Sequence, residues 1–502
     1  MHIVWFKRDL RIEDHQALIQ AVQSAPVMPL YILEPELWQQ PDMSRRHYMF
    51  LQDCLYELDQ SLTMLGQKLI IKVGNAVDVL DAIRARHAIQ ALWSHQETWN
   101  GWSYERDKAV KCWCKSHTIT WHEPFQNGVI RRLSDRNDWS ARWYREMKKP
   151  MLRAPSYLKT IDEYSDNLPD YAELGAGQDS VNGIQKGGRT EGLRQLKSFL
   201  YKRGEGYSKE MSSPVTAFDS CSRLSAHLAF GTLSMREIFQ ACEKRNQEIR
   251  KMAREDKGKW PSATRSFSSR LRWHCHFMQK LEDEPRIEFK NMHPAYNGLR
   301  EQDFNNDYFE AWKSGMAGYP MVDACMRALT ATGWLNFRMR AMVMSFASYH
   351  LWLHWRKPAL HLANLFTDYE PGIHYSQVQM QSGTTGINAI RIYNPIKQGI
   401  DHDPEGSFIR HWIPELRNID QAYIHTPWQA GSQMNGYPMP IVDEKTTRKA
   451  AADKLYSLRK NNAAHREAAQ TIVKKHGSRK SVSTRKRRQK QAKTPIQCEL
   501  PL

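Results

Sequence analysis

Five short apolar runs, rich in β-branched residues, alternate with amphipathic stretches over the first 125 residues of the chain. The runs lie at 2–7, 27–33, 68–74, 91–95 and 118–124. The stretches between them, near 14–24, 45–64, 76–87 and 102–116, have the apolar spacing of helices. Because strands that alternate with helices pair in parallel, this order predicts a doubly wound parallel sheet, an α/β domain over residues 1–125.

The rest of the chain has a different pattern. Its 502 residues exceed the size of one domain, so we expect two or three cores. Residues 126–195 are loosely patterned, which predicts a connector that runs over the surface. From 196 to 442 strand signals are sparse and long apolar-periodic segments such as 321–355 dominate, which predicts an all-helical domain.

Residues 443–502 are polar and strongly basic. Within them, 474–493 contains ten Lys or Arg and no Asp or Glu, so the net charge of +18 falls to +8 without this run. Two interpretations stay open, a solvated extension and an arm that binds phosphates with an affinity that falls with salt. We expect 443–502 to be a disordered tail.

Charge and cysteine content limit the class of protein. Lys and Arg number 72 against 54 Asp and Glu, an excess that attracts polyanions, so nucleic acid is the first partner to consider. The eight cysteines form no CxxC pair, which argues against a zinc or iron–sulfur site and predicts no metal. The sequence shows no secretory leader and no long apolar span. We therefore expect a cytoplasmic monomer that does not enter a membrane.

The predicted sheet lacks the two common phosphate-binding loops. No GxGxxG follows the first strand, and no GxxxxGK[ST] occurs in the chain. Dinucleotide or nucleoside-triphosphate binding by these loops is therefore not supported.

Four motifs together point to one protein family. They are WFKRDLRIEDHQAL (5–18), CSRLSAHLAFGTLS (221–234), GYPMVDACMRALTATGW (318–334) and RIYNPIKQGIDHDPEGSFIRHWIPEL (391–416). In order, spacing and wording they resemble the photolyase/cryptochrome flavoproteins over roughly residues 1–440. The resemblance implies an N-terminal antenna domain and a helical domain that holds folded FAD. It leaves room for a second, antenna chromophore whose identity the residues do not give.

The motif SRLS is the first candidate for cofactor binding. Its hydroxyls and backbone N–H groups open a predicted helix, where they suit a diphosphate, although read alone the motif is an ordinary N-cap. The resemblance implies that Ser222, Leu224 and Ser225 hold the FAD phosphates, with Tyr207 as a further partner.

Two arginines on one apolar predicted helix need partners. Arg338 and Arg340 lie among Met, Phe and Val, where an unpaired buried charge is costly. The resemblance pairs Arg340 with Asp368 beside the isoalloxazine and places Glu370 near the flavin. The alternative is a pair of salt bridges that only tether helices.

The resemblance also assigns roles to His374, His274 and Trp273. His374 corresponds to the position that faces flavin N5, and with a pKa near neutral it would donate or move a proton. A purely structural hydrogen bond is the alternative. His274 would contact the flavin, and Trp273 would stack on damaged bases. His274 and His276 are two apart on a helix and point in different directions, which argues against a metal site.

Several positions depart from the family's repair enzymes. Arg270 stands where dimer photolyases have a carboxylate, and Met380 stands where they have a second base-stacking Trp. Phe337 replaces an Asn, and Phe337 and Ala341 stand where (6-4) enzymes have histidines. Two readings of Arg270 stay open: it binds a phosphate or base edge, or it fills the pocket and pairs internally.

The usual electron-transfer chain is also altered. Of its three Trp positions, Trp355 is present, whereas Val378 and Gln302 occupy the other two. We therefore expect photoreduction by the common route to be impaired. Other aromatic residues in the same segments offer another path: Trp334, Trp352 and Tyr375.

The function most consistent with these residues is an FAD-dependent, blue-light DNA photolyase, a carbon–carbon lyase. It would donate an electron to a flipped-out pyrimidine lesion in UV-damaged single- or double-stranded DNA. The residues with catalytic roles would be Trp273, Arg270, His374 and Trp355. The alternatives are a cryptochrome-like photoreceptor without repair activity, and a nucleic-acid-binding protein with a vestigial flavin pocket.

Overall fold

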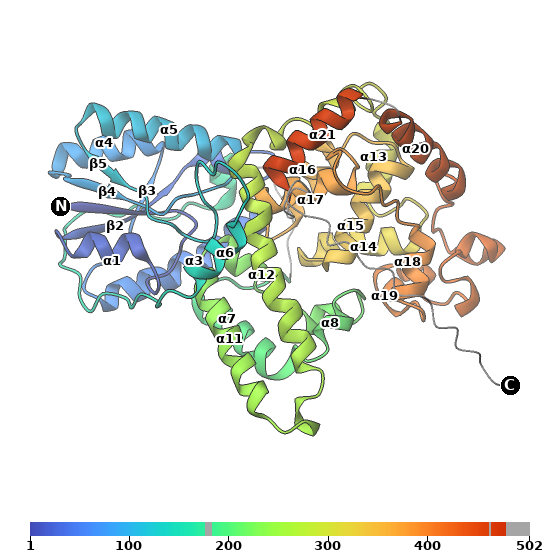
Figure 1. The fold of residues 1–502 in the computed structure, drawn as a ribbon, viewed down its shortest axis with the longest axis horizontal. Helices are drawn as coiled ribbons and strands as arrows, with labels where there is room; N and C mark the ends of the chain where they lie inside the picture. Colours follow the sequence, from blue (N-terminus) through green and yellow to red (C-terminus); the bar gives the residue numbers. More distant parts are fainter. Residues whose placement is uncertain (176–182, 461–462, 478–502) are drawn as a thin grey trace, which may run out of the picture.

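The computed structural model describes residues 1–175, 183–460 and 463–477. A sheet domain that contains the N-terminus lies beside a larger helical domain (Figure 1). In the described part of the chain, no helix has both the length and the apolar character needed to cross a membrane. The seven cysteines within it are all free thiols.

The N-terminal sheet has five parallel strands in the order β3-β2-β1-β4-β5. The strands are β1 (His2–Phe6), β2 (Val27–Leu33), β3 (Ile70–Val73), β4 (Ala91–Trp93) and β5 (Thr120–His122). Every residue of β1 and β2 is buried, as expected for strands covered on both faces. The predicted doubly wound α/β domain is confirmed.

Helices cover both faces of this sheet. Figure 1 shows α4 and α5 on one side of it and α1 and α3 on the other. The helices are α1 (Gln16–Val22), α2 (Pro35–Trp38), α3 (Arg45–Met64), α4 (Ala76–Arg86) and α5 (Gly101–Ser116). Local capping fixes where two of them begin, since the Asn75 and Asn100 side chains accept backbone N–H groups of the first turns of α4 and α5.

The connector contains more structure than its sequence suggests. It carries α6 (Trp139–Met147) and η1 (Tyr171–Leu174). Trp139, Trp143 and Met147 of α6 are buried in a cluster with helices of the second domain. Residues 176–182 of the predicted connector lie outside the described residues.

The second domain is built from helices, and its described part from Arg189 onward contains no strand. Its first part comprises α7 (Arg189–Ser198), η2 (Phe199–Arg203), α8 (Tyr207–Glu210), α9 (Ala217–Ser220), α10 (Ser225–Ala229), α11 (Met235–Lys251), η3 (Glu255–Lys257), α12 (Trp260–Asp283), η4 (Pro285–Glu288) and η5 (Pro294–Tyr296). Its second part comprises α13 (Asn306–Lys313), α14 (Pro320–Thr332), α15 (Phe337–Ser345), η6 (Phe346–His350), α16 (Arg356–Leu365), α17 (Pro371–Gln381), α18 (Pro395–His402), α19 (Ser407–Trp412), η7 (Pro414–Leu416), η8 (Gln421–Tyr423), η9 (Pro427–Gln429) and η10 (Gly431–Met434). Helices α12 and α17 pack against each other at its centre. The predicted all-helical domain is confirmed.

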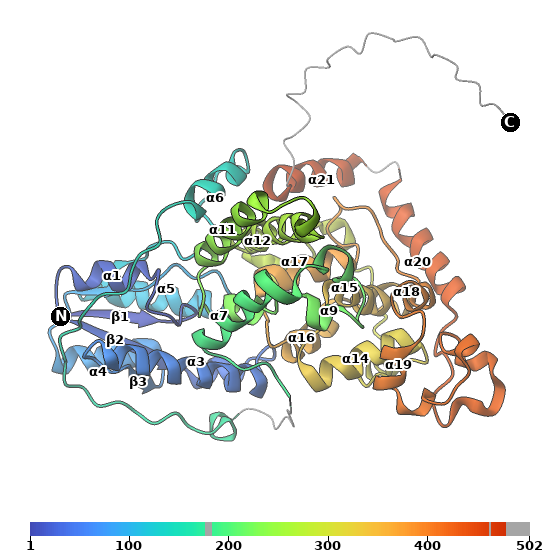
Figure 2. The ribbon, with the colours of Figure 1, turned by 90° about the horizontal axis from the view of Figure 1, so that it is seen from below.

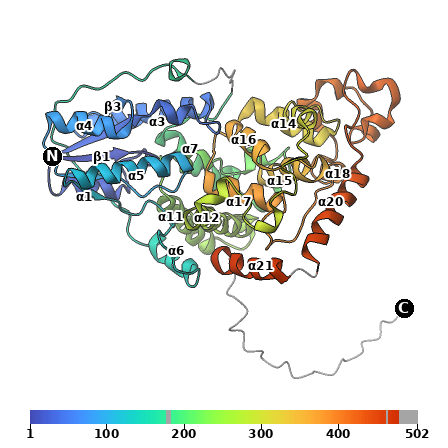
Figure 3. The same cartoon turned by 90° about the horizontal axis from the view of Figure 1, so that it is seen from above.

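The prediction of a disordered tail from 443 is wrong for two segments. Residues Glu444–Arg459 form α20 and Ala463–His476 form α21. Ala451 and Leu455 of α20 are buried, and Ile472 of α21 packs with apolar residues at the end of α12. Figures 2 and 3 show α21 beside α12. A few widely spaced apolar residues thus anchor these two helices, although their average composition is polar. Residues 478–502 of the predicted tail lie outside the described part.

Candidate functional site

A cavity of about 420 Å³ opens into the helical domain between α12, α15 and α17. Its volume is in the range of sites for cofactors and drug-sized ligands. Eleven of the predicted site residues line it: Tyr207, Ser222, Ser225, Arg270, Trp273, His274, Arg338, Arg340, Asp368, Glu370 and His374. Leu224 is 1% exposed and packs into the core, and Trp355 is fully buried outside the cavity wall. SRLS opens only a five-residue helix, α10.

Arg340 and Asp368 form a bidentate ion pair on the cavity wall. Arg340 Nη1 and Nη2 lie 3.0 and 2.9 Å from the two Asp368 oxygens. Burial raises the pKa of Asp368, but Arg340, a hydrogen bond from Ser225 and the charge of Arg223 together hold it below its ordinary value. The predicted pairing is confirmed. For Arg338, by contrast, no ion pair occurs with the described residues, and its guanidinium lies 6.0 Å from the Tyr393 ring.

The two cavity histidines are neutral near pH 7. Burial lowers the pKa of both His274 and His374 to about 4. His374 Nε2 lies 2.9 Å from the Ala359 carbonyl, so the neutral ring donates there and its Nδ1 is an acceptor. The expectation that His374 titrates near neutral pH is therefore wrong, because burial outweighs the nearby Asp368 carboxylate.

Glu370 is the group of this cavity that titrates near neutral pH. Burial raises its pKa to about 7, and the Arg8 charge only partly opposes this. Glu370 lies between the main cavity and a small neighbouring cavity that Arg8 also lines. The resemblance implied this role for His374, because burial cannot be read from the motif DYEPGIH.

Five buried polar atoms around the cavity have no partner within the described part of the protein. They are Arg223 Nη1, His274 Nδ1, Glu370 Oε1 and Gln377 Oε1, and Asn336 Oδ1 is a fifth. Buried polar atoms are normally hydrogen-bonded, so this set fits a polar ligand that offers both donors and acceptors. A cationic guanidinium, hydroxyls and amide or carboxyl oxygens suit the diphosphate, ribityl and ring edges of FAD. The residues present therefore fit the cofactor that the resemblance implies.

Arg223 of the SRLS motif also lines the cavity, although it was not among the predicted site residues. It has a left-handed φ of 60°, and its guanidinium lies between the rings of Phe218 and Trp334, at 4.3 and 4.2 Å. Burial lowers its pKa to about 10, so it keeps its charge at neutral pH. The signal was in the SRLS motif itself, which places an arginine between the two serines.

The mouth of the cavity combines arginine with aromatic side chains. Arg270 is exposed and lies 5.7 Å from the ring of Phe337, which is 49% exposed. Arg270 is hydrogen-bonded to Tyr207 and lies 3.9 Å from Met211 Sδ, but no carboxylate in the described residues forms an ion pair with it, so its charge is available to an anion. Trp273 is half-buried beside it, with the Phe277 ring 5.6 Å away. Met380 is half-buried and lies off the cavity wall, whereas Ala341 is on it.

The proposed electron-transfer residues are only partly connected to the cavity. Trp355 donates to Asn291 Oδ1 at 2.7 Å, and its ring centroid lies 6.3 Å from that of Tyr375. Val378 is on the cavity wall, and Gln302 is exposed at the surface. Of the other candidates, Trp334 lines the cavity. Trp352 instead packs against Arg300 and Lys454, both at 4.4 Å.

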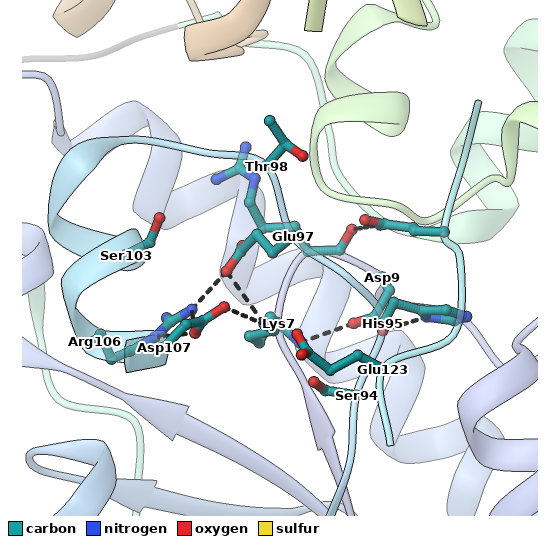
Figure 4. Close-up of polar contacts among 12 residues, drawn as sticks. Lys7, Asp9, Ser94, His95, Glu97, Thr98, Ser103, Arg106, Asp107 and Glu123 are labelled. Carbon is teal, nitrogen blue, oxygen red and sulfur yellow. Dashed lines mark hydrogen bonds and ion pairs between the residues drawn. The ribbon is translucent and has the colours of Figure 1, made fainter. Parts of the chain in front are cut away.

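At the carboxyl ends of the sheet strands, ion pairs fill the place where doubly wound folds often bind ligands. Lys7 follows β1 and lies 3.1 Å from Asp107 and 3.6 Å from Glu97, and Arg106 pairs with both acids (Figure 4). These groups satisfy one another, which agrees with the missing phosphate-binding loops.

A nearby buried cluster brings Asp9, His15 and His95 within metal-ligand distance of one another. Both histidines contact Asp9 Oδ2, at 3.0 and 2.7 Å. His15 Nδ1 accepts the Leu18 N–H, so its Nε2 carries the proton that faces Asp9. We assign this cluster to hydrogen bonding.

A second, larger cleft of about 620 Å³ lies between the two domains. Its walls are the first half of α5, connector residues 131–136, the end of α12 and α21. Lys474 and Lys475 of α21 line it, so the first residues of the basic run belong to a cleft wall.

Family models and relatives agree with this architecture. Residues 2–152 match the model described as DNA photolyase, and 267–457 match the FAD binding domain of DNA photolyase. A deoxyribodipyrimidine photo-lyase of Streptomyces griseus is 30% identical over 462 residues, which cover 88% of this chain and 96% of the relative. Cryptochrome-2 of Arabidopsis thaliana is also 30% identical, over 90% of this chain and 78% of the relative.

Solved structures of both kinds superpose on the chain. A bacterial class III photolyase from Agrobacterium tumefaciens matches with a TM-score of 0.76 and 26% identity, over 91% of this chain and 98% of the other. A Synechocystis cryptochrome matches with a TM-score of 0.78 and 26% identity, over 90% of this chain and 98% of the other. The chain is a member of the photolyase/cryptochrome family, with an FAD-binding helical domain.

Proposed function

We propose that this protein is an FAD-dependent photolyase that repairs UV-induced pyrimidine lesions in DNA with blue light. The observation that carries the proposal is the cavity, in which a paired Asp368 and unpartnered polar atoms lie beneath a mouth lined by Trp273 and Arg270. When bound and reduced, FAD supplies a light-excited electron.

In this proposal the chain's own residues bind the cofactor and position the lesion. Arg223, Ser222 and Ser225 bind the cofactor's phosphates, while Arg340 and Asp368 hold charge beside its ring system. Trp273 stacks on the extruded lesion, and stacking of this kind is worth about 1–3 kcal/mol per base. Arg270 binds a phosphate or base edge.

The interdomain cleft is our candidate for a second chromophore. Its volume of about 620 Å³ exceeds that of the main cavity, and the ion-paired acids Glu97 and Asp107 are part of its wall. A structurally similar archaeal photolyase from Sulfolobus tokodaii, with a TM-score of 0.76, is described with two FAD molecules.

The chain's net charge and cavity mouth favour DNA as partner, and the expectations of a monomer and a cytoplasmic location stay predictions.

A cryptochrome-like photoreceptor is the second candidate. It is favoured by Arg270 in place of a carboxylate, by Met380 off the cavity wall, and by relatives named cryptochrome. Competition binding separates the two, since a repair enzyme prefers a duplex with one pyrimidine lesion over the undamaged duplex. Equal binding of both duplexes by flavin-loaded protein favours the photoreceptor.

Reconstitution with FAD tests the cavity itself. We expect FAD to stay with the protein through gel filtration, and Asp368→Asn to reduce its retention at equal protein folding. A colourless wild-type protein would indicate a nucleic-acid-binding protein with a vestigial flavin pocket.

A further inference from the structure

A buried tyrosine with an adjacent carboxyl group forms part of the cavity wall. Tyr369 lines the cavity and is 2% exposed. Its hydroxyl donates to Asp42 Oδ2 at 2.7 Å, and Asp42 is itself 3% exposed. This hydrogen bond joins the helical domain to the loop before α3 of the sheet domain, so packing of the two domains fixes its geometry.

Tyr369 is also in contact with the aromatic residues behind the cavity. Its hydroxyl lies 3.3 Å from that of Tyr375. The Tyr375 ring centroid is 6.3 Å from Trp355, and the Tyr369 ring centroid is 5.4 Å from His374. Neighbouring aromatic side chains therefore lead from the buried core to the cavity, in the order Trp355, Tyr375 and Tyr369. Val378 on the cavity wall has no oxidisable ring and cannot serve as a donor there.

We propose that Tyr369 is the immediate electron donor to the flavin during photoreduction, and that Asp42 accepts its phenolic proton. The inference rests on the proposed function, because it needs FAD in this cavity. In the step, the Tyr369 O–H bond breaks, the proton moves to Asp42 Oδ2, and one electron passes to light-excited oxidised flavin. Tyr369 becomes a neutral radical and the flavin is reduced by one electron. A thiol in solution later returns the electron, and Asp42 returns the proton.

The surroundings favour loss of the proton and electron together. Burial and the neighbouring Asp42 raise the pKa of Tyr369 well above its ordinary value, so the phenol stays protonated in the dark. A buried cation on the oxidised ring would be costly, whereas proton transfer to Asp42 leaves the ring neutral. Asp42 also accepts a hydrogen bond from Asn100 at 3.2 Å, which holds its carboxyl group in place.

The chain offers a matched control for this pair. Tyr437 is 3% exposed and donates to the buried Asp323, but neither residue lines the cavity. Tyr437→Phe therefore removes the same kind of hydrogen bond at a site remote from the flavin.

The test is blue-light photoreduction of the FAD-loaded full chain with a thiol as reductant. We expect Tyr369→Phe to retain FAD but to be photoreduced at least about tenfold more slowly, and Tyr437→Phe to behave as wild type. Electron paramagnetic resonance of frozen, illuminated wild type should show a neutral tyrosyl radical that Tyr369→Phe lacks. Asp42→Asn keeps the shape of the site without the base, so its photoreduction should be slow and less sensitive to D2O than that of wild type.

Several outcomes would overturn the inference. Wild-type photoreduction rates in both Tyr369→Phe and Asp42→Asn would do so, as would a tyrosyl signal that persists in Tyr369→Phe. FAD retention identifies the source of failure. If wild type retains FAD and the variants give these results, only the assignment of the electron donor is wrong. If wild type retains no FAD, the proposed function is wrong and the inference is wrong with it.

Discussion

At the scale of single residues, burial decides which groups in the cavity carry charge. His274 and His374 are neutral because water is excluded from them, whereas Asp368 stays ionised because Arg340 pairs with both of its oxygens. Among the described residues Glu370 has no such ion-pair partner, and burial raises its pKa to about 7. Proton exchange near physiological pH therefore belongs to Glu370.

The raised pKa of Glu370 predicts a pH-dependent effect on stability. Its pKa is about 7 in the folded protein against 4.5 for the ordinary group, so the folded state binds more protons between these values. Stability from this group is present below pH 4.5 and is lost as pH rises through 7. We expect the unfolding free energy of Glu370→Gln to rise relative to wild type by about 1–3 kcal/mol between pH 5 and pH 8.

Urea denaturation at the two pH values measures this difference. The exposed Glu105 serves as the control, because Glu105→Gln should change stability equally at both pH values. An equal effect of Glu370→Gln at pH 5 and pH 8 would show that Glu370 is ionised throughout this range.

Replacement of Trp273 tests whether this side chain recognises a DNA lesion. Replacement by Ala removes one stacking surface, and we expect affinity for a lesion-containing duplex to fall by about 5- to 150-fold, equivalent to about 1–3 kcal/mol. Binding of undamaged duplex should change little, because no base is extruded there. Fluorescence anisotropy measures both, with Tyr56→Ala, on the exposed surface of α3, as control. Equal losses for both duplexes would argue against stacking on a lesion.

At this scale most of the predicted site residues lie on the cavity wall, but their protonation states were not predicted correctly. The family motifs identified eleven lining residues, including the Arg340–Asp368 pair. The pKa values of His374 and Glu370 depend on burial, and the Tyr369–Asp42 hydrogen bond joins residues 327 positions apart. Neither can be read from a local pattern.

At the scale of elements, α21 is the last helix of the described residues and packs against the end of α12. His476 Nε2 lies 2.7 Å from Glu284 at the end of α12, and Ile472 is buried beside Ile287. Removing residues 463–502 should therefore lower the thermal midpoint, because it exposes this apolar surface. Removing only 478–502 should leave the midpoint unchanged.

The shorter truncation also tests the basic arm. It removes eight Lys or Arg residues, so each phosphate contact that they make should reduce the dependence of DNA affinity on log salt by about 0.9. Binding titrations over a range of salt concentrations measure this slope. An unchanged slope would leave the segment as a solvated extension.

Elements with strong periodicity were predicted closely, and those anchored by few residues were missed. The α3 and β2 boundaries agree with the predicted ranges 45–64 and 27–33, because each has a continuous buried face. Helices α6, α20 and α21 were not predicted, because their burial comes from tertiary contacts of a few apolar residues in polar surroundings.

At the scale of the whole molecule, the sheet domain and the helical domain meet around Tyr369 and Glu370. Asp42 and Arg8 from the sheet domain contact the loop that carries Tyr369 and Glu370. The order of strands, connector and helices was predictable from periodicity. The interface between the domains was not, because its contacts join distant segments.

Repair of DNA by light-excited FAD in this cavity can be measured on defined lesions. Reduced, FAD-loaded protein is mixed with duplexes that carry one cyclobutane dimer or one (6-4) photoproduct, and intact pyrimidines are counted after light and after darkness. We expect light-dependent restoration of one lesion, with none in the dark. Restoration of neither lesion, while the flavin in the same samples still responds to light, would contradict this expectation and favour a photoreceptor.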